Sequence, residues 1–174
     1  MKLTIREMAL FGMFGGLMYA SKVLMEVLPN VHLIGVFVVV LTAIYRQKAL
    51  YPIYIFVFIT GLLNGFNTWW IPYVYIWTVL WGGVMLIPTR MHKVWQTVAY
   101  VIVCGAHGFL YGTLYAPFQA LAFGLDFQGM IGWIIAGIPF DVIHGVSNLL
   151  CGVFVIPGLI TVLRKAENTI QKNE

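Results

Sequence analysis

Three long stretches without a charged residue limit the folds open to this chain more than any other feature of its sequence. They cover residues 49–89, 94–125 and 142–163, and they are 41, 32 and 22 residues long. A helix that crosses a bilayer needs about 20 predominantly apolar residues. Hydrophobic residues occupy 61% of the 174 positions, and a chain this short cannot bury so much apolar surface in a core of its own. The sequence therefore predicts a membrane protein and argues against a soluble enzyme or a disordered chain.

Turn signals divide the apolar sequence into segments of helical length. The clearest breaks are Pro29-Asn30, the basic stretch 46–48, the polar stretch 64–68 and Pro88. We expect an all-α integral membrane protein whose single domain, residues 1–174, contains six transmembrane helices. The predicted spans are residues 4–28, 31–45, 49–64, 72–87, 94–116 and 139–163.

We have three further expectations for the last part of the chain. Residues 117–128 are expected to form a connection, and Pro139 is expected to separate an interfacial segment from the last span, because proline interrupts a helix. The tail from Arg164 is expected to be polar and solvated.

A cleaved signal peptide is the competing interpretation of the first span, but Glu7 lies inside it and no A-x-A site follows.

The basic residues support a six-span topology with both termini in the cytoplasm. That arrangement places nine of the ten on one side, and Lys22 alone falls near the other. The positive-inside rule makes the nine-residue side cytoplasmic, which fits a multi-pass protein of the bacterial cytoplasmic membrane. The nine are Lys2, Arg6, Arg46, Lys48, Arg90, Lys93, Arg164, Lys165 and Lys172.

Other functional classes find little support in the composition. The net charge is +4, but the basic residues are scattered, so we expect no nucleic-acid partner. Cys104 and Cys151 lie in apolar segments without a CxxC motif and are interpreted as small buried hydrophobic residues. No cofactor is expected.

Small residues recur at every fourth position of the first span, as Gly12, Gly16 and Ala20. Such a flat face lets two membrane helices approach closely. Packing inside the same bundle and docking to a partner membrane subunit explain it equally well. A second stripe of this kind, in the fifth span, consists of Gly108, Gly112 and Ala116.

The last span contains a polar face formed by Asp141, His144 and Asn148 at i, i+3 and i+7. Ionisable groups inside a span are costly and usually face the bundle interior or a water-filled cavity. We favour a ligand site here. The alternative is a structural network in which Asp141 orients the His144 ring and Asn148 bonds a neighbouring helix. A metal site formed by Asp141, His144 and His107 is a weaker possibility, since no motif supplies a full ligand set.

Further candidate ligand contacts come from polar and aromatic residues predicted near the outer side. Aromatic walls with a few placed polar groups are typical of small-molecule pockets, and here they would suit a flat, hydrogen-bonding heterocycle. Interfacial belts are the alternative explanation for Trp69, Trp70, Trp133 and Tyr115. The candidates are His32, Asn67, Trp77, His107, Tyr111 and Trp133.

The chain is similar to the substrate-binding S components of energy-coupling-factor (ECF) transporters, which take up vitamins in bacteria. The similarity rests on the size, the six spans, the stripe of the first span and the last-helix segment Ile138–Asn148. It implies that Gly12, Gly16 and Ala20 match an A-x-x-x-A type motif that docks on a coupling transmembrane subunit, and that two ATPase subunits complete the complex. The binding component would topple in the membrane to deliver its ligand.

The resemblance predicts a specificity subunit of an ABC importer for a water-soluble vitamin or related heteroaromatic nutrient. Asp141 would pair with a cationic or N–H group of the ligand. The chain contains no P-loop, G-x-S-x-G or H-E-x-x-H motif, so ATP hydrolysis is expected in the partners and no catalytic residue is assigned. The alternatives are a self-sufficient proton-coupled secondary transporter that uses Asp141 and His144 as a relay, and an intramembrane enzyme that uses them as acid and base.

Overall fold

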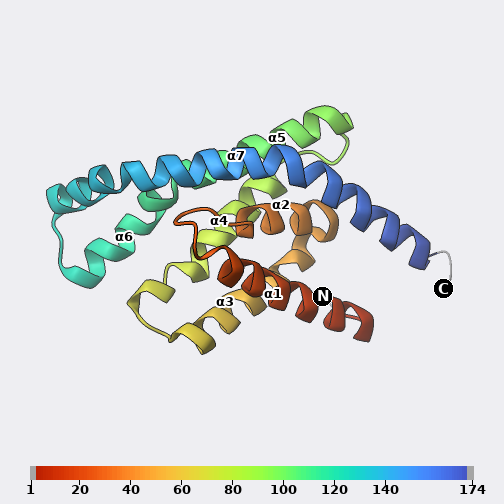
Figure 1. The fold of residues 1–174 in the computed structure, drawn as a ribbon, viewed down its shortest axis with the longest axis horizontal. Helices are drawn as coiled ribbons and strands as arrows, with labels where there is room; N and C mark the ends of the chain where they lie inside the picture. Colours follow the sequence, from red (N-terminus) through yellow and green to blue (C-terminus); the bar gives the residue numbers. More distant parts are fainter. Residues whose placement is uncertain (1–2, 172–174) are drawn as a thin grey trace.

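A computed structural model describes residues 3–171, which form helices joined by short turns and contain no strand (Figure 1). The protein is all-α, as the sequence predicts. The elements are α1 (Ile5–Met25), α2 (Ile34–Tyr45), η1 (Arg46–Ala49), α3 (Leu50–Asn64), η2 (Thr68–Trp70), α4 (Tyr73–Met85), α5 (Lys93–Phe109), α6 (Tyr111–Phe123) and α7 (Phe127–Gln171).

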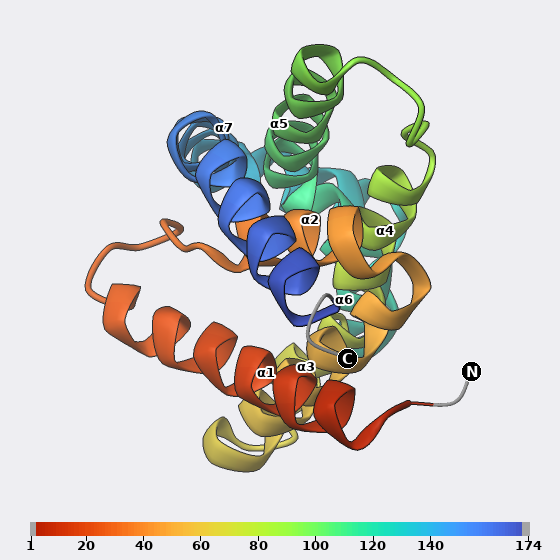
Figure 2. The same cartoon turned by 90° about the vertical axis from the view of Figure 1, so that its right-hand side faces the viewer.

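Helix α2 forms the centre of the bundle, and nine of its 12 residues are buried. It packs against α7, α4 and α5, while α1 packs mainly on α3, and the longest helix, α7, lies along α5. Seen end-on, α5 and α7 lie on one side of α2, and α1 and α3 on the other (Figure 2). The uninterrupted valine-rich sequence of α2 suits this position, because it offers apolar side chains in every direction.

The outer faces of the other helices are strongly apolar. Leu24, Leu86, Leu121 and Phe154 are each about four-fifths exposed. Four helical stretches are long and apolar enough to cross a membrane: Ile5–Met25, Ile34–Asn64, Lys93–Phe123 and Phe127–Thr169. Exposed apolar surface on this scale is compatible with a lipid environment.

Charged residues from several elements gather at one end of the bundle, which we call the basic end. Arg6 of α1 pairs with Glu167 of α7 at 3.1 Å, and Glu7 of α1 pairs with Lys48 of η1 at 2.5 Å. Arg46 Nη2 donates to the Met85 carbonyl oxygen at 2.8 Å. Both ends of the described chain lie toward this end (Figure 1). Lys2 and Lys172, which the topology prediction also used, lie outside the described residues.

The structure differs from the predicted boundaries in the second half of the chain. The segment 94–116 is not one helix, because the helix breaks at Leu110, and α6 then continues through most of the predicted connection to Phe123. Pro139 does not divide the last segment, since α7 is helical from Phe127 to Gln171 with both Pro139 and Pro157 inside it. The tail after Arg164 is also helical, and Glu167 accepts hydrogen bonds from Arg6 and Tyr45.

Candidate binding site

Five ring side chains from five segments meet inside the bundle, and we call them the aromatic cluster. They are His32 from the α1–α2 loop, Trp77 from α4, His107 from α5, Tyr111 from α6 and His144 from α7. The closest ring centroids are those of His32 and His144, at 4.5 Å, and those of Tyr111 and His144, at 4.8 Å. Trp77 lies 5.7–6.0 Å from His107, Tyr111 and His32. All five were predicted as ligand contacts.

Local structure explains how these rings come together. The break at Leu110 leaves His107 and Tyr111 one turn apart, and their ring centroids lie 6.0 Å apart. Asn30 adopts φ 60°, a left-handed conformation that asparagine tolerates, and this turns the loop back toward the bundle. The Ser147 hydroxyl donates to the Asn30 carbonyl oxygen at 3.2 Å, which ties the loop carrying His32 to α7.

Four nitrogens of the aromatic cluster are buried without a hydrogen-bond partner among the described residues. They are His32 Nδ1, Trp77 Nε1, His107 Nδ1 and His144 Nε2, and the neighbouring Asn148 Oδ1 shares this state. Buried polar atoms are usually paired, because an unpaired one costs about 1–3 kcal/mol. The aromatic cluster therefore offers several unused hydrogen-bonding groups in one place.

The hydrogen bond of His107 defines the chemistry of its free nitrogen. His107 Nε2 lies 3.1 Å from the Ile76 carbonyl oxygen. A carbonyl oxygen only accepts, so Nε2 must donate, and Nδ1 of the neutral ring is then an acceptor. The indole Nε1 of Trp77 is a donor only. The cluster thus presents at least one acceptor and one donor on adjoining rings.

Asn148 is fully buried beside the aromatic cluster, where α2, α5 and α7 meet. Its Nδ2 donates to the Cys104 carbonyl oxygen of α5 at 3.2 Å. This is the kind of bond to a neighbouring helix that the structural interpretation predicts. The side-chain oxygen is still unpaired, so Asn148 could serve both helix packing and a ligand.

Asp141 does not orient the His144 ring as the structural interpretation proposed. Both of its carboxylate oxygens accept the backbone N–H of Gly112, at 2.9 and 3.1 Å. Gly112 is the second residue of α6, and the N-cap residue Leu110 offers no side-chain bond. A carboxylate from α7 therefore caps the positive end of α6. Its oxygens keep further acceptor capacity.

The other two predicted contacts lie away from the aromatic cluster. Trp133 stacks on Tyr115 with ring centroids 5.9 Å apart, and Tyr115 in turn lies 6.3 Å from Tyr111, so Trp133 is one residue removed. Asn67 precedes η2 and its exposed side chain lies near Gly65. The structure does not bring Asn67 to the cluster.

A pocket of about 470 Å³ adjoins the aromatic cluster through Tyr73, whose ring lies 5.7 Å from Trp77. Its other lining residues are Lys22, Glu26, Asn64 and Trp69. Lys22 and Glu26 are paired at 3.6 Å. The signal in the sequence is this i, i+4 pair of opposite charges at the end of the first span. The topology prediction uses Lys22 only as the one basic residue near the other side.

His32 is held in its neutral form by its surroundings. Burial lowers the pKa of His32 from 6.5 to about 4, and the nearby His107 and Lys22 lower it further by charge repulsion. A neutral imidazole offers one donor and one acceptor, so His32 adds hydrogen-bonding capacity and not charge.

The two small-residue stripes have different surroundings. A Cβ added at Gly12 or Gly16 would meet nothing within 4 Å, and Ala20 is exposed. The neighbouring Gly15 instead packs α1 against α3, where a Cβ would meet Ile55 and Phe56. The break at Leu110 divides the second stripe, so Gly108 lies on α5 whereas Gly112 and Ala116 lie on α6. Its glycines lie inside the bundle, since a Cβ at Gly108 would come within 2.8 Å of Gly145 Cα, and one at Gly112 within 2.6 Å of Asp141 Oδ2.

Among residues 3–171, no group of three His, Cys, Asp or Glu side chains is arranged to hold a metal ion. Asp141, His144 and His107 therefore do not form the metal-ligand set that the sequence offers as a weaker alternative.

No known protein family, curated protein sequence or solved structure matches the chain.

Proposed function

We propose that the protein is the substrate-binding S component of an ECF-type importer, and that the aromatic cluster binds a small, flat heteroaromatic nutrient such as a water-soluble vitamin. The observation that carries the proposal is the group of unpaired nitrogens on edge-on and tilted rings. A heterocycle with ring nitrogens and exocyclic N–H groups would satisfy these atoms.

The residues take distinct parts in this proposal. Trp77 donates to the ligand, His107 accepts from it, and His32 and His144 supply a further donor or acceptor each. Tyr111 forms an aromatic wall, and Asn148 offers its side-chain oxygen. Asp141 acts mainly by fixing the start of α6, and thereby the position of Tyr111, while its spare lone pairs could receive an N–H group of the ligand.

The energy for uptake would come from other subunits, which we propose to be a coupling transmembrane protein and two ATPases. The exposed stripe of Gly12, Gly16 and Ala20 is the proposed docking face, because nothing in the described chain covers the two glycines. The basic end would lie in the bacterial cytoplasm under the positive-inside rule, with six spans crossing the membrane.

The first test is to purify the protein from its native membrane and identify copurified small molecules by mass spectrometry. A heteroaromatic compound supports the proposal. The Trp77→Phe variant keeps an aromatic plane but removes the indole N–H, and should weaken binding of that compound about tenfold. Trp95→Phe is the matched control, because Trp95 is exposed at the start of α5, 12 residues before His107. Equal affinity of the Trp77→Phe variant and the native protein would contradict the assigned role.

A proton-coupled secondary transporter is the second candidate, because the rings of His32 and His144 lie 4.5 Å apart and could pass a proton through a polar ligand. Uptake driven by a pH gradient into liposomes that contain this protein alone would favour it. A strict requirement for ATPase partners would favour the S component.

A further inference from the structure

A second pocket lies at the opposite end of the bundle from the Lys22–Glu26 pair, between the start of α5 and the last turns of α7. Its volume is about 520 Å³. We call it the basic pocket, and its lining residues are Lys93, Ile160, Thr161, Arg164, Lys165, Asn168 and Thr169. Three of these seven are cationic, and none is acidic.

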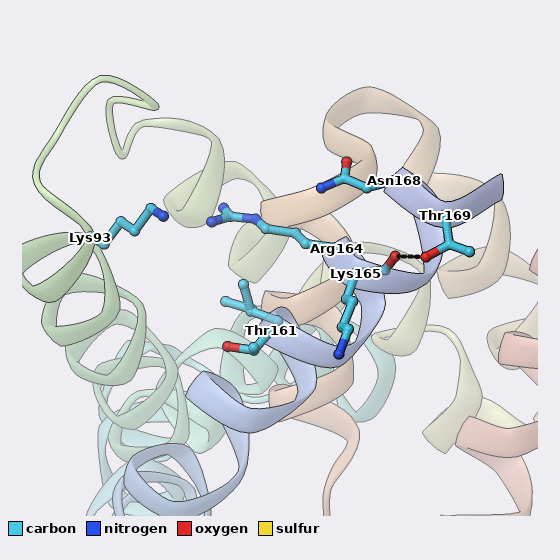
Figure 3. A pocket seen from close by; sticks show the side chains of 7 residues that line it. Lys93, Thr161, Arg164, Lys165, Asn168 and Thr169 are labelled. Carbon is cyan, nitrogen blue, oxygen red and sulfur yellow. Dashed lines mark hydrogen bonds between the residues drawn. The ribbon is translucent and has the colours of Figure 1, made fainter. Parts of the chain in front are cut away.

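Two of the three cations of the basic pocket face each other. Figure 3 shows the Lys93 ammonium and the Arg164 guanidinium pointing toward each other from α5 and α7, whereas Lys165 points away from them. Two like charges in this arrangement repel each other. Their position is favourable when an anion lies between them, and a guanidinium can bind a phosphate through two parallel hydrogen bonds.

The acidic residues nearby are engaged elsewhere. Glu167, on the same helix as Arg164, pairs with Arg6 and accepts from Tyr45. Within residues 3–171, the ion pairs are Arg6–Glu167, Lys22–Glu26 and Lys48–Glu7, so neither Lys93 nor Arg164 has a carboxylate partner there. The repulsion inside the basic pocket is therefore not relieved by the described chain.

The two threonine hydroxyls of the basic pocket already donate hydrogen bonds within α7. The Thr161 and Thr169 hydroxyls donate to backbone carbonyl oxygens of α7, at 2.8 and 2.9 Å. In Figure 3 the Arg164 guanidinium lies between the Lys93 ammonium and the exposed Asn168 side chain, so Asn168 lies on the far side of Arg164 from Lys93. The donors available to an anion between the two cations are thus those of Lys93 and Arg164.

Apolar surface flanks the basic pocket directly. Val94 and Trp95, which follow Lys93 on α5, are 61% and 65% exposed, and Val162 on α7 is 62% exposed. Tryptophan beside basic residues is typical of the level where lipid headgroups meet the hydrocarbon core. A lipid could therefore place its phosphate in the basic pocket and its acyl chains along α5 and α7.

We propose that the basic pocket binds a phosphate-bearing anion, and that its source is the headgroup of an anionic phospholipid. The phosphate lies between Lys93 and Arg164 and accepts from both. This site is separate from the aromatic cluster and does not depend on the identity of the transported ligand.

The test compares phosphatidylglycerol and phosphatidylcholine with identical acyl chains, added to the full-length protein in detergent and followed by native mass spectrometry. Phosphatidylglycerol should bind more tightly, and its affinity should fall about fivefold for each cation removed in Lys93→Gln and Arg164→Gln. Arg90→Gln is the matched control, because Arg90 is exposed on the neighbouring turn but does not line the pocket. It should bind as the native protein does.

Several outcomes would decide the proposal. Equal binding of both lipids, or an equal loss in Arg90→Gln, overturns it. The charge-conserving variant K93R/R164K should retain most of the affinity, and thermal unfolding of each variant shows whether it has folded. Inorganic phosphate is the second probe. If it binds alone with the same dependence on Lys93 and Arg164 and displaces the lipid, the source is a soluble phosphorylated compound; if neither phosphate nor lipid binds, there is no anion site.

Discussion

At the scale of single residues, the most informative observation concerns polar atoms that have no partner. A histidine or tryptophan nitrogen enclosed in apolar surroundings lowers stability unless it is hydrogen-bonded. Here such atoms gather on the aromatic cluster, where His107 can only accept at Nδ1 and Trp77 can only donate. The pattern specifies the hydrogen-bond types that the proposed ligand would have to complement, and it does so without a charged side chain.

The pH dependence of stability is one prediction at this scale. His32 is neutral in the folded protein, with a pKa of about 4, and titrates near 6.5 when unfolded. Below pH 6.5 the unfolded chain takes up a proton that the folded chain does not, so stability decreases as the pH falls from 6.5 toward 4. Thermal unfolding in detergent should show a loss of up to about 2 kcal/mol between pH 7.5 and 5 from this residue.

The variant His32→Asn should show a shallower dependence on pH than the native protein. His92→Asn serves as its control, because His92 lies exposed in the turn before α5. Parallel curves for His32→Asn and the native protein would show that His32 is not the group responsible.

Asp141 provides the second prediction at the residue scale. Its carboxylate caps α6 through Gly112 N–H, so Asp141→Ala should lower the free energy of unfolding by about 1–3 kcal/mol. Asp141→Asn should lose less, because an asparagine oxygen can still accept the bond. The measurement is thermal unfolding of both variants. Equal losses would show that the negative charge matters and not the cap.

At the scale of helices, α1 shows that two adjacent glycines can have opposite roles. Gly15 lies against Ile55 and Phe56 of α3, whereas Gly16 faces away from the described chain. One residue along a helix changes direction by about 100°, so the small-residue stripe and the buried face are different surfaces. Packing within the bundle therefore explains why residue 15 is a glycine, but it does not explain the glycines at positions 12 and 16.

This difference gives a matched pair of variants. Gly15→Leu should destabilise the isolated protein, because its side chain would collide with α3. Gly16→Leu should leave thermal unfolding nearly unchanged but prevent copurification with the proposed coupling subunit. If Gly16→Leu copurifies in full yield, the proposed docking face is wrong.

At the scale of the whole molecule, charge separates the two ends of the bundle. Arg6, Arg46 and Lys48 lie at the basic end with the basic pocket, while Lys22 lies beside Glu26 at the other. At 1.5 Å per residue the 45 residues of α7 extend over roughly 68 Å, about twice the thickness of the hydrocarbon core. A single helix thus connects the two ends and reaches beyond the apolar layer.

The orientation of these ends can be measured with cysteine variants in a background lacking Cys104 and Cys151. A membrane-impermeant maleimide applied to intact cells should label Asn67→Cys, which lies far from the basic end. It should label Arg90→Cys only after the cells are permeabilised. The reverse pattern would place the basic end outside and contradict the positive-inside assignment.

The sequence by itself determined the all-helical class and most of the helix positions in the first half of the chain. It did so because charge-free runs and turn residues determine helix formation and helix ends through interactions between residues close in the sequence. It also selected the five rings of the aromatic cluster, because polar residues in apolar helices are few. Only the tertiary structure decided that Asp141 caps α6, that α7 continues through Pro139, and that Asn67 lies apart. These outcomes depend on which helices are neighbours, and contacts between distant segments leave no local pattern in the chain.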